Sequence, residues 1–187
     1  MRVISGEFKG RVLKMPKGVK IRPTSQKVKE ALFSILGSQI CEASFLDLFA
    51  GSGSVGIEAI SRGAERVFFV ENNRLCIKTI EQNLNALGLE CSPATLLPFT
   101  AERAIGALAR KKQRFDFVFL DPPYYEEKLK NCLIKISAYD ILNPRSWVIA
   151  EHNQAQVLPQ QLSGLRVMFT KTYGDTALSF YRARPKK

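Results

Sequence analysis

The sequence has very few of the residues on which metal sites and catalytic triads are usually built. Its 187 residues include a single histidine, His152, which excludes zinc sites with several histidines and disfavours Ser-His-Asp or Cys-His catalysis. The four cysteines, Cys41, Cys76, Cys91 and Cys132, are scattered without a Cys-x-x-Cys pair, so we expect buried, reduced thiols and no metal site. The chemistry must therefore depend on carboxylates, aromatic rings, backbone groups and a cofactor.

Long apolar runs are also missing. No stretch approaches the roughly 20 continuous apolar residues of a membrane-spanning helix, and the start of the chain has no apolar run of signal-peptide length. Apolar residues nevertheless make up 45% of the chain, which is enough for a proper core in a protein of this size. We therefore expect a soluble, cytoplasmic protein, a monomer without a membrane partner.

Acidic residues are too few at the two ends of the chain to balance the basic ones. Residues 1–30 carry nine Lys and Arg against two Glu, and residues 166–187 carry six against one Asp. The net charge is +11, yet residues 31–165 are almost neutral. This pattern favours a nucleic-acid partner over termini that are basic only for solubility. The N-terminal residues expected to bind it are Lys9, Arg11, Arg22, Thr24 and Lys27.

From residue 45 onward, short apolar runs alternate with amphipathic segments. The runs predict strands at 45–49, 66–70, 94–97, 115–120 and 147–150, and the segments between them predict helices at 54–62, 73–87, 101–112 and 126–138. Such alternation is typical of right-handed βαβ units, and so of an open parallel sheet with helices on both faces. Residues 165–172 and 177–182 flank Tyr173-Gly174-Asp175 and predict a terminal antiparallel hairpin. The fold class is α/β.

The N-terminal residues form a separate, basic pattern. Residues 2–5 and 11–14 flank a turn bounded by glycines and predict a short β-hairpin, followed by a basic loop from Pro16 to Pro23. Thr24 is then placed to cap a helix that Gly37 ends. We accordingly divide the chain into a basic extension, residues 1–37, and an α/β domain, residues 38–187.

A glycine motif connects the first strand of the α/β domain to its helix. Gly51, Gly53 and Gly56 satisfy G-x-G-x-x-G between a strand and a helix, and Glu71 follows Gly51 by twenty residues, at the tip of the next strand. The glycines let the backbone approach a ligand closely, and Glu71 can accept both ribose hydroxyl protons. Together these features indicate nucleoside binding rather than a tight turn without a ligand.

The position of Asp47 distinguishes between possible nucleosides. A dinucleotide would place its pyrophosphate at the helix N-terminus, and Asp47 stands only four residues before Gly51, where a negative charge would oppose it. A carboxylate there suits a cationic amino-acid tail, such as the ammonium and sulfonium groups of S-adenosylmethionine.

A second motif ends the buried strand at 115–120. Asp121-Pro122-Pro123-Tyr124 follows it directly, and consecutive prolines cannot continue the hydrogen-bond ladder and hold a rigid, extended backbone. Asp121 is thereby presented at the carboxyl edge of the sheet, where Tyr124 can lie over a planar base. A simple strand-ending turn is the alternative, and the glycine motif upstream argues against it.

These motifs resemble those of a known class of enzyme. Residues 121–124 resemble the (D/N)PP(Y/F) motif of amino-group methyltransferases, and residues 47–53 resemble their cofactor loop. Arg22-Pro23-Thr24, residues 28–33 and residues 173–178 complete a series that, from Met1 to about Tyr181, is similar to the bacterial 16S rRNA guanine-N2 methyltransferase family, the small-subunit methyltransferase D type.

The resemblance implies a Rossmann-like seven-stranded sheet and methyl transfer from S-adenosylmethionine to the N2 amino group of a guanine. The substrate would be 16S rRNA in the small ribosomal subunit or its assembly intermediate. Asp121, Pro122, Pro123 and Tyr124 would grip the base. The residues implied in cofactor binding are Asp47, Phe49, Ala50, Gly51, Gly53, Glu71, Asn72, Thr100 and Ala101, with Thr100 standing where this class usually has Asp or Asn.

The chemistry of Asp121 favours guanine independently of the resemblance. The N1–H and N2–H edge of guanine offers two adjacent donors to a carboxylate, whereas adenine and cytosine present a donor beside an acceptor, which suits an Asn amide. Two alternatives stay open: a DNA adenine-N6 or cytosine-N4 methyltransferase, and a non-catalytic RNA-binding assembly factor. The first usually needs a target-recognition region, for which no segment is long enough.

Overall fold

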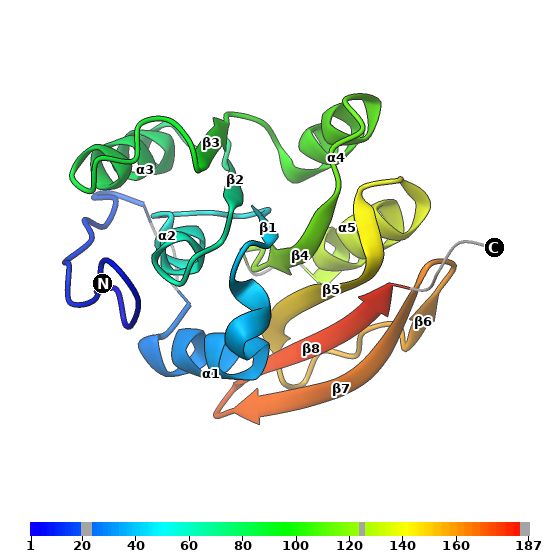
Figure 1. The fold of residues 1–187 in the computed structure, drawn as a ribbon. Coiled ribbons are helices and arrows are strands. Elements are labelled where there is room, and N and C mark those ends of the chain that lie inside the picture. The colour runs from blue at the N-terminus through cyan, green and yellow to red at the C-terminus, as the bar shows by residue number, and fades with distance from the viewer. Residues whose placement is uncertain (20–23, 124–125, 184–187) are drawn as a thin grey trace.

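Helices and strands alternate along the chain and build one mixed sheet, shown in Figure 1. The computed structural model describes residues 1–19, 24–123 and 126–183. The helices in this part are α1 (Gln26–Leu36), a short 3-10 helix η1 (Gly37–Ile40), α2 (Ser54–Ser61), α3 (Arg74–Asn85), α4 (Ala101–Arg110) and α5 (Glu126–Ala138). The strands are β1 (Ser44–Asp47), β2 (Arg66–Val70), β3 (Ala94–Leu97), β4 (Phe115–Leu120), β5 (Leu142–Asn153), β6 (Gln161–Leu162), β7 (Leu165–Tyr173) and β8 (Thr176–Ala183).

The order of the strands confirms the predicted α/β fold. Within the described residues the sheet has eight strands in the order β3-β2-β1-β4-β5-β8-β7-β6. The first five in this order pair in parallel, and β8, β7 and β6 continue the sheet with antiparallel pairs. The two-residue strand β6, at the edge, is the addition to the seven strands that were predicted.

The topology places a crevice between β1 and β4. The chain winds outward from β1 to β2 and β3 on one side, and from β4 to β5 on the other. Open α/β sheets bind their ligands where the strand order reverses in this way, outside the carboxyl ends of the strands. Asp47, the last residue of β1, and Asp121, directly after β4, both lie at this edge.

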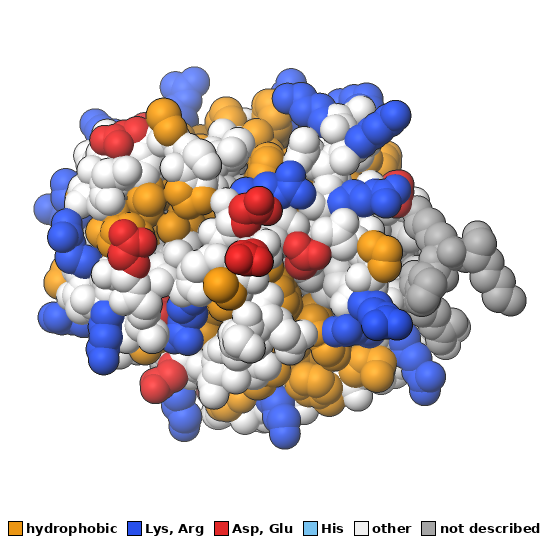
Figure 2. All heavy atoms as spheres, viewed as in Figure 1, with side chains coloured by type: hydrophobic (Ala, Val, Ile, Leu, Met, Phe, Trp, Pro, Cys, Tyr) orange, Lys and Arg blue, Asp and Glu red, His pale blue; other side chains and the backbone are white. Residues whose placement is uncertain are grey.

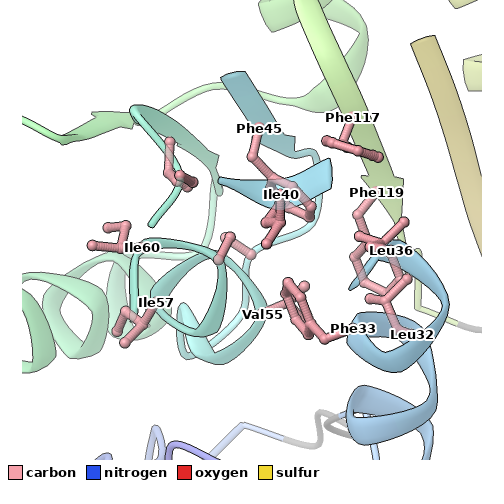
Figure 3. Close-up of a cluster of buried hydrophobic side chains, with 14 of the residues drawn as sticks. Leu32, Phe33, Leu36, Ile40, Phe45, Val55, Ile57, Ile60, Phe117 and Phe119 are labelled. Carbon is pink, nitrogen blue, oxygen red and sulfur yellow. The ribbon is translucent and has the colours of Figure 1, made fainter. Parts of the chain in front are cut away.

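Two hydrophobic clusters cover the two faces of the sheet. Helices α1, α2 and α3 bury one cluster, in which Phe33 of α1 stacks on Phe45 of β1 and Phe45 stacks on Phe117 of β4 (Figure 3). Helices α4 and α5 bury the other, around Val118 and Leu120. Because helices cover both faces of the sheet, the central strands have continuous apolar sequences. These apolar runs allowed the strands to be predicted.

The N-terminal segment forms a shorter hairpin than predicted. Arg2 and Val12 make an antiparallel bridge, and the N–H groups of Val3 and Leu13 donate to the carbonyls of Arg11 and Met1 at 3.0 and 2.8 Å. The next backbone donors bind α2: the N–H groups of Ile4 and Ser5 donate to the Glu58 carboxylate at 2.8 and 3.0 Å. The segment also packs closely against the end of α2 at Gly6 (φ +81°), where a Cβ would collide with the carbonyl of Ser61.

A buried ion pair joins this segment and α1 to α2. The Nζ of Lys29 lies 3.2 Å from Oε2 of Glu58, both side chains are 0% exposed, and Lys29 also donates to the carbonyl of Arg2 at 3.0 Å. Val3 and Leu13 belong to the same hydrophobic cluster as the central strands. The first residues therefore share the core of the sheet, and the division at residues 37 and 38 stays a prediction.

Most predicted bounds moved by no more than two residues, and the start of α1 and the bounds of β5 differ for an identifiable reason. Ser25, and not Thr24, caps α1, because its hydroxyl accepts the N–H of Val28 at 3.2 Å. Gly37 ends α1 as predicted. Strand β5 spans Leu142–Asn153 rather than 147–150, since its whole C-terminal half pairs with β8.

The prediction of buried cysteines was wrong for half of them. Cys76 and Cys132 are buried, whereas Cys41 and Cys91 are exposed, and all are free thiols. In residues 1–19, 24–123 and 126–183, no three His, Cys, Asp or Glu side chains lie together as a candidate metal site. No helix within the same ranges has the length and hydropathy to cross a membrane.

Candidate functional site

A cavity of about 640 Å³ opens at the carboxyl edge of the parallel strands. Twelve of the predicted site residues lie on its wall: Thr24, Asp47, Phe49, Ala50, Gly51, Glu71, Asn72, Thr100, Ala101, Asp121, Pro122 and Pro123. Gly53 does not line it, and Tyr124 and Arg22 lie outside the described residues. The fold thus brings the two predicted motifs, which are about seventy residues apart in sequence, into one cavity.

Glu71 organises the glycine loop through its carboxylate. Its Oε2 accepts the N–H of Gly51 at 2.9 Å, and its Oε1 accepts the N–H groups of Asn72 and Asn73 at 2.8 and 2.9 Å. The end of β2 and the loop after β1 are therefore joined at one side chain.

The other two glycines of the motif shape the turn and its packing. Gly53 has φ +80° at the start of α2, a conformation that L side chains rarely adopt. A Cβ on Gly56 would lie 2.2 Å from the ring of Phe69, so this glycine lets α2 lie directly on β2. Gly56 was predicted to approach the ligand, and its position shows that it serves helix packing.

Asp47 is a buried carboxyl group at the bottom of the cavity. It is 1% exposed, and its Oδ2 accepts the N–H of Gly56 at 3.2 Å. The pKa of Asp47 is raised to about 7, chiefly by burial and also by the charge of Glu71, against the opposing effect of the hydrogen bond from Gly56. Two carboxyl groups in this part of the wall favour a cationic group in the cavity.

Asp121 has a partner from the start of the chain. The hydroxyl of Thr24 donates to Oδ2 of Asp121 at 3.1 Å, and Thr24 is only 5% exposed. The predicted role of Thr24 in RNA binding stays a prediction, but the described contact of this side chain is with Asp121. Pro122 and Pro123 continue the wall beyond the carboxylate.

The sequence analysis missed a polar wall at the far side of the cavity. It is formed by residues at the end of β5, in the loop after it and at the start of β8: Glu151, His152, Asn153, Gln156 and Thr176. The position of the first three at the carboxyl end of a parallel strand was the signal that could have identified them.

His152 on this wall is a structural group. Its Nδ1 lies 2.8 Å from the carbonyl of Asn153, so Nδ1 carries the hydrogen, and its Nε2 lies 2.8 Å from the hydroxyl of Ser179. Desolvation lowers the pKa of His152, which favours the neutral ring, and Nε2 then accepts from Ser179. Both ring nitrogens are thereby engaged within the fold.

An aromatic side chain lines the cavity in the segment between β3 and α4. The ring of Phe99 lines the cavity, with the guanidinium of Arg103 at 4.6 Å from its centroid. The Thr100 hydroxyl accepts the N–H of Arg103 at 3.4 Å and caps α4. This capping role explains why Thr is accommodated at this position.

The predicted RNA-binding cations within the described residues, Lys9, Arg11 and Lys27, do not line the cavity. Lys9, Arg11 and Lys27 are exposed, and Arg11 also donates to the carbonyl of Ala86 at 2.7 Å. On the face shown in Figure 2, Lys and Arg side chains lie mostly around the perimeter, and several Asp and Glu side chains gather near the centre. Contact of these cations with RNA stays a prediction.

Comparison with known proteins extends along nearly the whole chain. The family model described as Conserved hypothetical protein 95 matches residues 1–182. YlbH of Bacillus subtilis is 43% identical over 184 residues, which cover 98% of this chain and 100% of that one. Ribosomal RNA small subunit methyltransferase D of Escherichia coli is 30% identical over 182 residues, which cover 97% of this chain and 89% of that one.

Solved structures of other proteins share the fold of this chain. The structure of yhhF from Escherichia coli superposes with a TM-score of 0.86 at 26% identity, covering 100% of this chain and 99% of that one. The 16S rRNA N2 methyltransferase of T. thermophilus, in complex with AdoMet and guanosine, shares the fold, with a TM-score of 0.69 at 21% identity over 90% of this chain and 45% of that one. The chain therefore belongs to the family described as Conserved hypothetical protein 95, and it is of the ribosomal RNA small subunit methyltransferase D type that its motifs resemble.

Proposed function

We propose that this protein transfers the methyl group of S-adenosylmethionine to the exocyclic N2 amino group of a guanine in 16S rRNA. The substrate is the small ribosomal subunit or its assembly intermediate. The observation that carries the proposal is the single cavity in which the glycine loop, the buried Asp47 and Asp121 meet. The name of the Escherichia coli relative supports methylation of small-subunit rRNA, and the carboxylate of Asp121 supports guanine as the target.

The hydrogen bonds of Glu71 indicate how the ribose is held. A carboxylate has about four lone-pair positions, two on each oxygen. Its Oε1 already accepts two backbone N–H groups, whereas its Oε2 accepts only that of Gly51. The one position left, on Oε2, therefore accepts a ribose hydroxyl of the cofactor, next to the backbone of the glycine loop. Asp47 faces the ammonium group of the methionine tail.

The burial of Asp47 makes cofactor binding depend on pH. With a pKa of about 7, this carboxyl group is mostly ionised at pH 8 and mostly neutral at pH 6. The cofactor ammonium prefers the ionised form, so affinity should fall as the pH falls, by about tenfold between these two values. Calorimetric titrations across this range measure the effect. Asp47→Asn should bind more weakly and show no such dependence; an equal pH dependence in that variant would assign the titration to another group.

The cofactor supplies an electrophilic methyl group on its sulfonium. The lone pair of the guanine N2 is delocalised into the ring, which makes it a poor nucleophile. Asp121 and a backbone carbonyl near Pro122 accept hydrogen bonds from the amino group and concentrate electron density on the nitrogen. The proton that the nitrogen loses on methylation passes to the Asp121 carboxylate. We expect Tyr124, which lies outside the described residues, to stack on the base, a contact that contributes about 1–3 kcal/mol in other base–aromatic pairs. The fixed alignment of nitrogen, methyl and sulfur contributes most of the acceleration.

The proposal is tested by mapping the modified base. Small subunits from cells that lack the protein should carry one unmethylated guanine N2, and the purified protein with radiolabelled S-adenosylmethionine should restore it. Label transferred to DNA adenine or cytosine would favour the DNA enzyme class instead. Tight RNA binding without any transfer would favour an assembly factor.

The basic N-terminal segment gives a separate prediction for RNA binding. Replacing Lys9, Arg11 and Lys27 together by Gln should flatten the log–log salt dependence of RNA affinity by about two units, at about 0.7–0.9 per phosphate contact. Cofactor affinity should barely change. The matched control replaces Arg110, Lys111 and Lys112, which are exposed at the end of α4 and should leave the slope unaltered. Equal slopes for wild type and the N-terminal variant would mean that this charge serves only solubility.

A further inference from the structure

The contact between Thr24 and Asp121 joins two distant parts of the chain. The two residues are 97 positions apart, and both line the cavity. Ser25 caps α1, so the Thr24 hydroxyl has no part in the start of that helix. It donates to Oδ2 of Asp121 from a position that is almost completely buried.

The packing of α1 fixes the position of this hydroxyl. Lys29, one and a half turns further along, pairs with Glu58 in the interior, and Glu58 belongs to α2. Helix α2 begins directly after the glycine loop. Thr24 is therefore held by the packing of α1 on α2, the helix that follows the glycine loop. Its hydrogen bond connects these helices to Asp121, which follows β4.

We propose that Thr24 is a positioning residue for methyl transfer: its hydroxyl sets the rotation of the Asp121 carboxylate and so aligns it with the target amino group. The inference rests on the proposed function, because it assigns Asp121 to the amino group. The last torsion of an Asp side chain has a broad energy profile, so a fixed donor is needed to define the carboxylate plane. Methyl transfer depends on alignment, and small misplacements of an acceptor slow such reactions strongly.

The proposal also gives the basic segment a second role. Lys27 and the other cations expected to bind RNA belong to the same stretch of chain as Thr24. A segment that binds the RNA and also orients the acceptor carboxylate ensures that the carboxylate is in place when the substrate is bound.

The test is the pair Thr24→Val and Thr24→Ser. Valine keeps the shape and removes the hydroxyl, and serine keeps the hydroxyl. Single-turnover methylation of small subunits from cells that lack the protein, at saturating cofactor, should be about tenfold slower with Thr24→Val, which is the effect of one hydrogen bond to a charged group. Thr24→Ser should restore the rate to within about twofold. The affinity for the cofactor should be unchanged in both, so that a slower rate reports on the transfer step.

Ser25→Ala is the matched control. It removes the cap of α1 one residue away and should lower the melting temperature without slowing methyl transfer. A wild-type rate for Thr24→Val would overturn the inference. So would a rate for Thr24→Ser as low as that of Thr24→Val, since a role in packing alone predicts this result.

The proposed function and this inference can fail separately. If the wild-type protein methylates none of the rRNA substrates, the proposed function fails, whatever Thr24 does. The hydrogen bond itself is followed by the NMR chemical shift of the Asp121 carboxyl carbon at fixed pH. This shift should move in Thr24→Val and stay in place in Ser25→Ala. An unmoved resonance in Thr24→Val would overturn the positioning role.

Discussion

Asp121→Asn should slow methyl transfer by about a hundredfold or more, with little effect on folding or on cofactor affinity. If the Asp121 carboxylate accepts the N1–H and N2–H protons of guanine, the substitution places an amide donor opposite one of them. The amide oxygen can still accept from Thr24, which holds Oδ2 at 3.1 Å, and this arrangement turns the NH2 group toward the base. Two donors then face each other in a buried site, and the accelerating acceptor is lost.

Single-turnover methylation of the assembled rRNA substrate measures this effect. If Asp121 only forms a turn, Asn should serve equally well and the rate should stay near wild type. Such a result would end the argument for the guanine edge, although it would leave the family assignment intact. Because Thr24 acts through Asp121, adding Thr24→Val to Asp121→Asn should cost little further. Fully additive losses would mean that the two side chains act separately.

The parts of the fold that were predictable from the sequence are those that local pattern controls. Strands β2, β3 and β4 have the bounds that their apolar runs predicted. The clearest run is that of β4, which is buried along almost its whole length, because a buried parallel strand is apolar on both faces. Strand β5 was too short in the prediction. Its first residues include Pro144 and Arg145, which do not resemble a strand, and its last residues are held by the ladder to β8. A ladder between distant segments leaves no local signal in either of them.

The same distinction applies to the site. The glycine loop and Asp121-Pro122-Pro123 could be identified because each motif is continuous in sequence and follows a strand. His152 and Asn153 reach the cavity from the carboxyl end of β5, whereas Thr176 reaches it only because β8 lies beside β5. The sequence placed Thr24 at the start of a helix, but the direction of its hydroxyl depends on the buried ion pair between Lys29 and Glu58. The position of Thr176 and the direction of the Thr24 hydroxyl depend on how distant elements pack together, so they were not predictable from local sequence.

Glu71→Ala should weaken S-adenosylmethionine binding by about 1–3 kcal/mol, which is about 5- to 150-fold in Kd. The structure gives two reasons for this loss. The variant removes the acceptor for a ribose hydroxyl, and it also leaves the N–H groups of Gly51, Asn72 and Asn73 without the carboxylate that holds the loop. Calorimetry measures the affinity. Tighter binding of NAD than of S-adenosylmethionine by the wild-type protein would overturn the choice of cofactor.

An analogue of the cofactor that lacks both ribose hydroxyls separates the two reasons. If Glu71 binds the ribose, removing the hydroxyls should cost affinity in the wild-type protein and almost none in Glu71→Ala, because the partner is already gone. If Glu71 only orders the loop, the analogue should lose the same factor in both proteins. The expected result is the first, since Oε2 accepts a single backbone N–H and lies on the side of Gly51, whereas Oε1 is filled by Asn72 and Asn73.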